Sequence, residues 1–398
     1  MPRYEMIERK CASFEHIMQK NSSLSRALAA YYAEDDGYAD KMKYIFTPLS
    51  SVSCRVPAED AKKLFPKDMH TSYSRLEKYI VCNFSYFCEY ELKLKDSLPV
   101  KFGALDVGNF MHKILEVSVR YALSHADATD EEIKKEIEFV CRTYVESLCR
   151  EKYAAVSPRL LRLTDYLSAS CEKFVLSIRN EFKESKFRAR DFEVVIGKGE
   201  DIEPIRLESE NGCVELRGKV DRVDTYEDGE GKIYIRVADY KTGSKKFELS
   251  NVEKGRDLQM LLYLFSICEN GKKKYGDNLS PAGVMYVSVR PSAQDVDLGS
   301  TAPEEKNKNS GLLLDNDEVL TAMEPSLEGK FIPVSVGSGG KKKGSLISEE
   351  AFASLKEDVV KTVLAACDEL RSGKADACPE DKSACEYCKM HAVCRVKK

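Results

Sequence analysis

Apolar residues recur every three or four positions through one long stretch of the chain, residues 105–187. Phe110, Ile114, Val117 and Tyr121 show this spacing, which keeps one face of a helix apolar. The stretch is interrupted twice by short polar segments. We therefore expect three amphipathic helices, over residues 105–124, 130–152 and 157–187.

The spacing changes near Asp191, where short apolar runs with alternating residues begin. Residues 192–196 are predicted to form a strand, and residues 213–225 and 232–241 a hairpin around the Asp- and Gly-containing turn 227–231. The other expected elements are helices over 8–18, 23–33, 257–270 and 348–372, a strand over 283–289 and a mostly loop region over 290–345. Helices, then a small sheet, then helices predict an α/β or α+β core with extensive helical decoration.

Composition narrows the class of protein. The chain has 398 residues, 43% hydrophobic and 32% charged, which excludes a disordered tail or a collagen-like repeat. Its formal net charge is −4, so any nucleic-acid binding must come from a local basic patch. The sequence has no apolar run near the roughly 18 residues of a membrane span, and its start lacks a secretory leader. We expect a cytoplasmic protein with no membrane partner.

Carboxylates and a lysine lie at the end of the expected hairpin. The strand over 232–241 has an apolar face that continues into Asp239 and Lys241, and Asp221 lies on the preceding strand. Two carboxylates can hold Mg²⁺ or Mn²⁺, and a neighbouring lysine can stabilise charge on a phosphate, which favours metal-assisted phosphodiester hydrolysis. A surface ion pair of Asp239 and Lys241 is the alternative. Asp221 points to the opposite face of its strand from the apolar Val220. The sequence therefore leaves open whether Asp221 lies close to Asp239, and a bend near Gly218 would allow it.

Two helical pairs could complete such a site. His112 follows Gly108 by one helical turn, and the glycine leaves room for a ligand or a neighbouring backbone. Gln259 and Tyr263 have the same four-residue spacing on the helix expected after the hairpin. Each residue alone is also typical of an ordinary packing or surface position.

Taken in chain order, these fragments resemble the RecB-family branch of the PD-(D/E)xK nucleases. The matching set is Gly108-x3-His112, Glu193 in a strand, Gly218-x2-Asp221, Asp239-Tyr240-Lys241 and Gln259-x3-Tyr263. The resemblance implies a restriction-endonuclease-like α/β core, a small mixed sheet flanked by helices. It implies that His112, Asp221, Asp239 and the backbone carbonyl of Tyr240 bind Mg²⁺ or Mn²⁺. Lys241 would be the catalytic lysine, supported by Gln259 and Tyr263, with Glu193 an auxiliary acidic residue.

Cysteines form a second pattern. The chain has 14, and most occur singly in apolar segments, as expected of buried thiols. Cys385, Cys388 and Cys394 instead form C-x2-C-x5-C near the end of the sequence. With Cys82, they resemble the cysteines of the same nuclease domain in the B subunit of AddAB-type helicase–nucleases, where they would ligate a [4Fe–4S] cluster. Asn83 departs from the proline usual there. A zinc site made of Cys378, Cys385, Cys388 and Cys394 is the alternative.

The resemblance implies a function and a domain division. The chain would be a metal-dependent exonuclease that degrades unwound single-stranded DNA during double-strand-break repair and recombination, with a helicase–nuclease A subunit as its partner. We expect residues 71–398 to be the nuclease domain, closed by the iron–sulfur cluster, and residues 1–70 to be a helical lead-in from the helicase-like region of a longer subunit. The sequence has no ATP-binding Gly-Lys-Ser/Thr motif. The alternatives are a stand-alone RecB-like exonuclease of the CRISPR-adaptation type and a catalytically silent DNA-binding clamp.

Overall fold

The structure is a computed structural model, and the residues it describes form two compact units. It describes residues 54–94, 104–151, 158–241, 246–289, 309–337, 339–379, 381–386 and 388–394, with a few single positions before residue 35. The helix expected over 8–18 lies outside the described residues, and the helix expected over 23–33 is described only at single positions. The first unit takes in residues 1–64, 78–96 and 370–398, and the second takes in residues 65–77 and 97–369.

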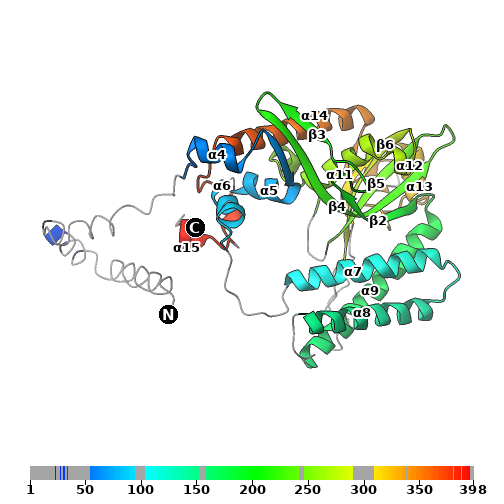
Figure 1. Ribbon diagram of the computed structural model, residues 1–398. Coiled ribbons are helices and arrows are strands. Elements are labelled where there is room, and N and C mark those ends of the chain that lie inside the picture. The colour runs from blue at the N-terminus through cyan, green and yellow to red at the C-terminus, as the bar shows by residue number, and fades with distance from the viewer. Residues whose placement is uncertain are drawn as a thin grey trace. The chain divides into compact units, whose positions relative to one another are not determined.

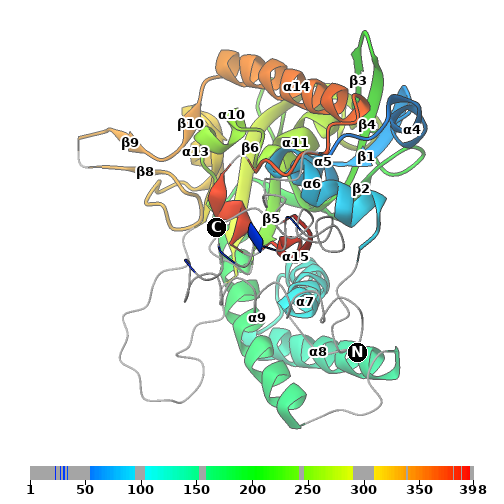
Figure 2. The same ribbon diagram turned by 90° about the vertical axis from the view of Figure 1, so that its left-hand side faces the viewer.

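Three long helices of the second unit confirm the three- and four-residue spacing. They are α7 (Ala104–Ser124), α8 (Asp130–Glu151) and α9 (Pro158–Glu184), and they pack on one another (Figure 2). Phe110 and Ile114 of α7 are buried, as their position on the apolar face predicts. Arg179 of α9 lies 2.9 Å from Asp130, at the start of α8, and so ties the two helices together.

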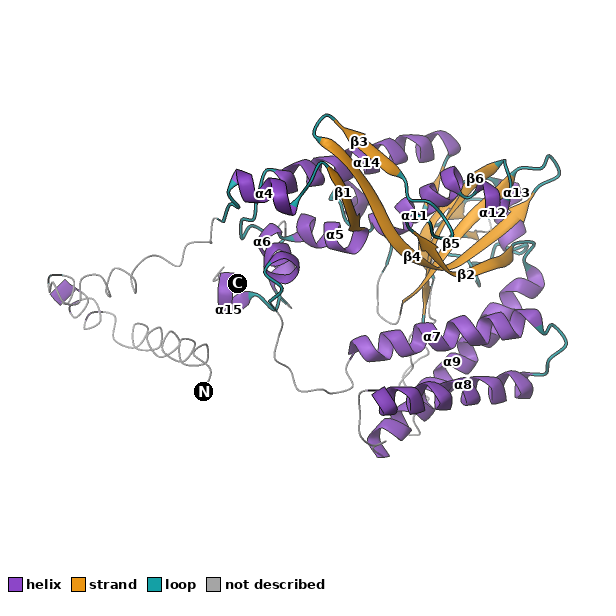
Figure 3. Cartoon of the chain, in the orientation of Figure 1, coloured by secondary structure: helices purple, strands orange, loops and turns teal. Residues whose placement is uncertain are grey.

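A mixed sheet of eight strands forms the centre of the second unit (Figure 3). The strand order β1-β4-β5-β6-β7-β10 contains parallel and antiparallel pairs, and β2 and β3 also pair with β4. This confirms the mixed sheet flanked by helices. The strands are β1 (Asp68–Ser72), β2 (Arg188–Ile196), β3 (Arg206–Ser209), β4 (Gly212–Glu227), β5 (Ile233–Lys241), β6 (Leu279–Ser288), β7 (Ser310–Leu314) and β10 (Leu346–Ile347).

Strand β4 changes its partners along its length. Its first half pairs with β1 and β3, and from Gly218 onward it pairs with β2 and then β5. Arg222 pairs with Ala238 in the antiparallel β4–β5 ladder, so one step further Asp221 faces Asp239. The strand register therefore settles the convergence that the sequence left open, and it does so without an irregularity in the β4–β5 pairing.

The remaining elements of the second unit follow β5. Helix α11 (Leu258–Asn270) packs against β5 and β6, and it is preceded by α10 (Leu249–Glu253) and followed by α12 (Lys272–Tyr275). The region expected to be mostly loop, residues 290–345, contains strands and a helix that the sequence did not predict. Strand β7 there extends the sheet, because its run of three leucines is buried against β6. Helix α13 (Asp317–Met323), the two-residue strands β8 (Ser335–Val336) and β9 (Lys342–Lys343), and helix α14 (Glu349–Arg371) complete the order.

The first unit joins chain segments that lie about 300 residues apart (Figure 1). Val56 N–H donates to Gly373 O at 2.8 Å, Ala375 N–H donates to Cys54 O at 2.9 Å, and Phe84 N–H donates to Asp376 O at 3.1 Å. The helices around these contacts are α4 (Ala58–Leu64), the end of α5 (Tyr73–Val81), α6 (Asn83–Tyr86) with a π-helical turn (Phe87–Glu91), and α15 (His391–Cys394). In the described part of the chain, no helix is long and apolar enough to span a membrane.

Candidate metal centre and cysteine cavity

Three side chains converge where α7 meets β2 and β4. Ligand atoms of His112, Glu193 and Asp221 all lie within 4.8 Å of one another. His112 Nδ1 lies 3.1 Å from Asp221 Oδ2, and the same oxygen accepts a hydrogen bond from the Tyr240 backbone N–H at 2.8 Å. Imidazole and carboxylate groups are ligands that divalent cations accept. The donor set therefore fits a divalent metal ion.

Glu193 has an unusual backbone in this trio. It lies in the middle of β2, between Phe192 and Val194, which pair with Arg222 and Val220. Its φ is +58°, a left-handed conformation that costs a non-glycine residue about 1 kcal/mol or more. Its carboxylate also forms an ion pair with Lys219. A strained, partly buried carboxylate beside Asp221 is a stronger candidate ligand than the sequence alone indicated.

Asp239 lies next to the trio and is held differently. It is 7% exposed, and its Oδ2 lies 2.5 Å from the Nζ of Lys241, two residues along the same face of β5. Burial, followed by the charge of Asp221, raises the pKa of Asp239 to about 6, against the lowering effect of Lys241. The structure thus brings Asp221, Asp239 and Lys241 together at one end of the hairpin. The ion pair of Asp239 and Lys241 is largely buried, unlike the surface pair that was the alternative.

His112 is drawn toward its charged form by the same carboxylates. Burial opposes the charge, but the hydrogen bond and the charge of Asp221, with a further contribution from Asp239, raise the pKa of His112 overall. Gly108 lies one turn earlier on α7, and a Cβ atom there would meet no other atom within 4 Å. The face of α7 beside His112 is therefore open, as the glycine predicted.

The helix after the hairpin brings Gln259 and Tyr263 to β4. Gln259 Nε2 donates to the Tyr263 hydroxyl at 2.9 Å, and the backbone of Lys219 hydrogen-bonds the same hydroxyl. A Cβ atom at Gly218 would lie 2.0 Å from that hydroxyl oxygen. Only glycine leaves the space, so Gly218 of the Gly-x2-Asp motif permits the contact between Tyr263 and β4.

Two residues near the site carried no signal in the sequence. Lys219 was not expected beside Glu193, and Tyr286 of β6 was not expected to face Lys241, whose Nζ lies 5.7 Å from the centre of the ring. Tyr286 pairs with Asp239 in the β5–β6 ladder. Both placements follow from strand register, which a single sequence does not give.

The cysteines predicted as ligands line one cavity in the first unit. It measures about 120 Å³ and is lined by Cys82, Cys385, Cys388 and Cys394, with Lys78, Phe84, Ser85 and Met390 among its other walls. The Cys388 sulfur lies 3.9 Å from the Ser85 hydroxyl, and the Met390 N–H donates to the same sulfur. Asn83, in place of proline, donates to Tyr79 O at 3.1 Å and so caps the end of α5. Four convergent thiols fit a metal cluster.

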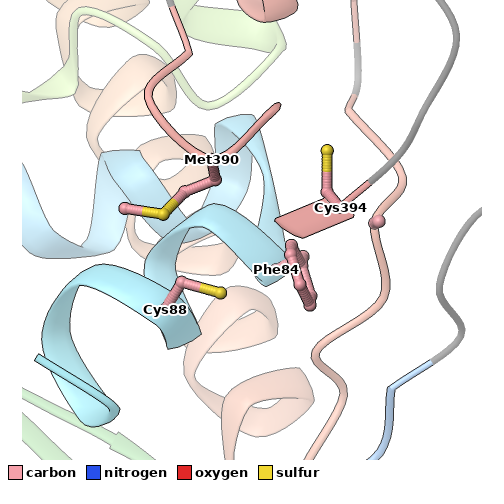
Figure 4. Packing of buried hydrophobic residues seen from close by; sticks show 5 residues of the cluster. Phe84, Cys88, Met390 and Cys394 are labelled. Carbon is pink, nitrogen blue, oxygen red and sulfur yellow. The ribbon is translucent and has the colours of Figure 1, made fainter. Parts of the chain in front are cut away.

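Two further cysteines lie beside this cavity. Cys88 is fully buried, and it packs in one cluster with Phe84, Met390 and Cys394 (Figure 4). Cys54 is partly buried and packs against this cluster. Burial, followed by the proximity of Cys54 and Cys394, raises the pKa of Cys88 to about 11. Cys378, the fourth thiol of the zinc alternative, is exposed and does not line the cavity.

Known proteins resemble this chain over most of its length. The sequence model of the PD-(D/E)XK nuclease superfamily matches residues 70–395. Three curated relatives are each named as the B subunit of an ATP-dependent helicase/deoxyribonuclease. Those of Thermoanaerobacter sp. and Caldanaerobacter subterraneus subsp. tengcongensis are both 32% identical to this chain, over 85% and 86% of it and 31% of each relative. That of Clostridium perfringens is 29% identical over 99% of this chain and 37% of the relative.

The relatives are much longer than this chain. This chain spans about a third of the length of the relatives. The superfamily match covers well over half of this chain, and it includes every residue of the metal centre described above. The chain therefore belongs to the PD-(D/E)XK nuclease superfamily.

Proposed function

We propose that this chain is a metal-dependent deoxyribonuclease domain that hydrolyses phosphodiester bonds of single-stranded DNA. The observation that carries the proposal is the assembly of Asp221, Asp239 and Lys241 at one end of the β4–β5 hairpin, within reach of His112 on α7. These groups come from separate parts of the chain, and the superfamily match includes them all. A catalytically silent clamp would have no need to keep all four.

The proposed roles follow from the contacts. His112, Asp221 and Asp239 would hold Mg²⁺ or Mn²⁺, with the backbone carbonyl of Tyr240 as a further ligand and Glu193 in reach of the same ion. A cation bound there would polarise the scissile phosphate and lower the pKa of a water molecule. Lys241 would leave Asp239 to stabilise the charge that develops on the phosphate. Gln259 and Tyr263 would keep α11 in place against β4 and support the DNA backbone.

We further propose that Cys82, Cys385, Cys388 and Cys394 hold a [4Fe–4S] cluster, which takes four cysteine thiolates. Their shared cavity and the exposure of Cys378 outside it support this set over the zinc alternative. The cluster would stabilise the first unit and take no part in hydrolysis.

The partner and the wider role are inferred from the relatives. Their names couple a helicase to a deoxyribonuclease, so we propose that this domain acts in a heterodimer with an A subunit, on DNA unwound from a duplex end during double-strand-break repair. Residues 71–398 would be the nuclease domain, and residues 1–70 would lead in from the helicase-like region. A match of 29% identity over 99% of the chain, lead-in included, favours this over a stand-alone exonuclease.

The decisive experiment measures cleavage of end-labelled single-stranded DNA with Mg²⁺ or Mn²⁺. Wild type should cleave, and Asp239→Ala should lose cleavage while it unfolds at a denaturant concentration no lower than that of wild type. Asp127→Ala changes an exposed carboxylate in the α7–α8 connection and should cleave like wild type. Cleavage that survives in Asp239→Ala, or that needs no divalent ion, would overturn the proposal.

A further inference from the structure

Tyr240 lies between two residues of the proposed metal centre, Asp239 and Lys241, and its own side chain points to the other face of β5. It is 2% exposed. Its backbone N–H donates to Asp221, and its ring meets the His112 ring edge-on, with the ring centres 6.4 Å apart. Tyr240 thus contacts two candidate metal ligands, one through its main chain and one through its ring.

The hydroxyl of Tyr240 is bound by a fully buried arginine. Arg222 Nη1 donates to it at 3.2 Å, and the Arg222 guanidinium lies over the Tyr240 ring, with its carbon 5.7 Å from the ring centre. Burial raises the pKa of Tyr240 to about 12, although Arg222 lowers it, so the hydroxyl stays protonated at neutral pH. A neutral hydroxyl can accept the hydrogen bond from Arg222 and remain in place.

Arg222 is itself held in a closed set of buried charges. Its Nε lies 2.9 Å from Asp224, and Arg236 bridges the same aspartate and Glu181 of α9, at 2.8 Å and 2.6 Å. Arg222, Arg236 and Asp224 are 0% exposed and Glu181 is 2% exposed. Two positive and two negative groups balance, which buried ions require. Through these contacts, Arg222, the partner of the Tyr240 hydroxyl, is connected to Glu181 of α9.

We propose that Tyr240 is a positioning residue, whose hydroxyl is anchored by Arg222 and whose main chain and ring set the positions of Asp221 and His112. The proposal rests on the metal centre inferred above. In this role, the buried charges on one face of the sheet hold the carboxylates on the other face in position. If Tyr240 only filled space, its hydroxyl would be dispensable, because phenylalanine fills nearly the same volume.

Tyr240→Phe in the full chain tests this distinction. The DNA-free protein is titrated with Mn²⁺, and the concentration of free Mn²⁺ is measured by electron paramagnetic resonance. We expect its Kd to rise about tenfold, since groups that orient metal ligands typically contribute 10–100-fold to affinity or activity. We also expect kcat on single-stranded DNA to fall while KM for DNA is unchanged. Tyr234→Phe is the matched control, because Tyr234 is buried on the same face of the same strand and lies away from the metal centre.

A second variant tests whether Arg222 acts through the Tyr240 hydroxyl. Arg222→Lys keeps the charge but loses the fork that reaches both Asp224 and Tyr240. If Arg222 acts through the hydroxyl, adding Arg222→Lys to Tyr240→Phe should leave the Mn²⁺ affinity of the single Tyr240→Phe variant unchanged within twofold. If Arg222→Lys does not fold, Tyr240→Phe alone decides.

The outcomes separate the two inferences. If wild type binds Mn²⁺ and Tyr240→Phe matches it within twofold in Kd and kcat, the positioning role is wrong and the metal centre stands. Lowered stability with unchanged Kd would likewise show a packing role only. If wild type and Asp221→Ala both fail to bind Mn²⁺, the metal centre is wrong, and the positioning role falls with it.

Discussion

The Nζ atom of Lys241 lies 2.5 Å from Oδ2 of Asp239, so the proposed catalytic lysine is paired with a proposed metal ligand. Removing the lysine should leave the ligands in place. We expect Lys241→Ala to bind Mn²⁺ with an affinity within a few-fold of wild type at pH 8, while kcat falls by about 10²–10³, the usual cost of removing one charge-stabilising group.

Lys254→Ala, which removes an exposed lysine in the second unit, should behave like wild type. The measurement pairs calorimetric Mn²⁺ titration with single-turnover cleavage. A Lys241→Ala variant that cleaves within threefold of wild type would show that the lysine is not catalytic.

The raised pKa of Asp239 predicts how the metal-free protein responds to pH. Its native pKa of about 6 lies above the unfolded value near 3.9, so between these values the native state binds more protons than the unfolded state. Stability therefore falls as pH rises from about 4 to 6, by at most about 3 kcal/mol. Asp239→Asn should flatten this part of the profile. Urea unfolding in EDTA at several pH values measures the difference between the two proteins.

Metal binding should show the reverse trend. A bound cation needs deprotonated Asp239 and neutral His112, and the pKa of both groups is raised. We expect Mn²⁺ affinity to rise with pH through about 6 and to continue to rise above pH 6.5, where His112 still loses protons. An affinity that does not change between pH 5.5 and 8 would contradict the assignment of these ligands.

Replacing Gly108 with alanine should raise the stability of the protein but weaken its activity on DNA. A Cβ atom there meets nothing within 4 Å, and alanine is favoured over glycine inside a helix by about 0.5–1 kcal/mol, so Gly108→Ala should stabilise the protein by that amount. If the open face of α7 beside His112 admits DNA, the same variant should raise KM for single-stranded DNA several-fold without changing Mn²⁺ affinity. Gly229→Ala, also with open space around its Cβ, is the control for cleavage. Unchanged KM would place the DNA elsewhere.

The cysteine cavity predicts which thiols matter. Cys82→Ala and Cys394→Ala should lose iron and lower the denaturation midpoint, because metal binding and folding are coupled at a site that the unfolded chain lacks. Cys378→Ala should keep iron. Cys88→Ala should keep it too, because Cys88 does not line the cavity. Iron content and visible absorbance of anaerobically purified variants provide the measurement. Loss of metal from Cys378→Ala with retention in Cys82→Ala would favour zinc.

Sequence spacing predicted much of the fold because its signals are local. The helices α7, α8 and α9 follow from apolar periodicity, and β5 follows from alternation that ends in Asp239 and Lys241. Strand β7 was missed because its short apolar run stands among charged residues and is stabilised by pairing with β6 and β10, which lie far from it in the sequence or follow it. A strand with so few residues has no periodicity to read.

The site was predicted as a set of residues but not as a geometry. The order from His112 to Tyr263 indicated a nuclease, which the superfamily match confirms, and the roles of the single residues stay predictions. The left-handed backbone of Glu193 leaves no trace in the sequence. The placement of Cys54 and Cys88 beside the cavity depends on long-range contacts. The buried pairing of Arg222 and Arg236 with Asp224 was also missed, because charged residues that alternate along a strand usually indicate its solvent-facing side.

The backbone contacts of the first unit also fix when it can form. Val56, Cys54 and Phe84 have their partners at residues 373–376, which follow every strand of the eight-stranded sheet in the sequence. A ribosome makes the chain from its N-terminus, so every strand of the eight-stranded sheet, the last ending at Ile347, is complete before these partners exist. These contacts of the first unit can therefore form only after the whole eight-stranded sheet has been synthesised. Cys82 lies in the same unit, so it leaves the ribosome about 300 residues before Cys385, Cys388 and Cys394, the other cysteines of the cavity.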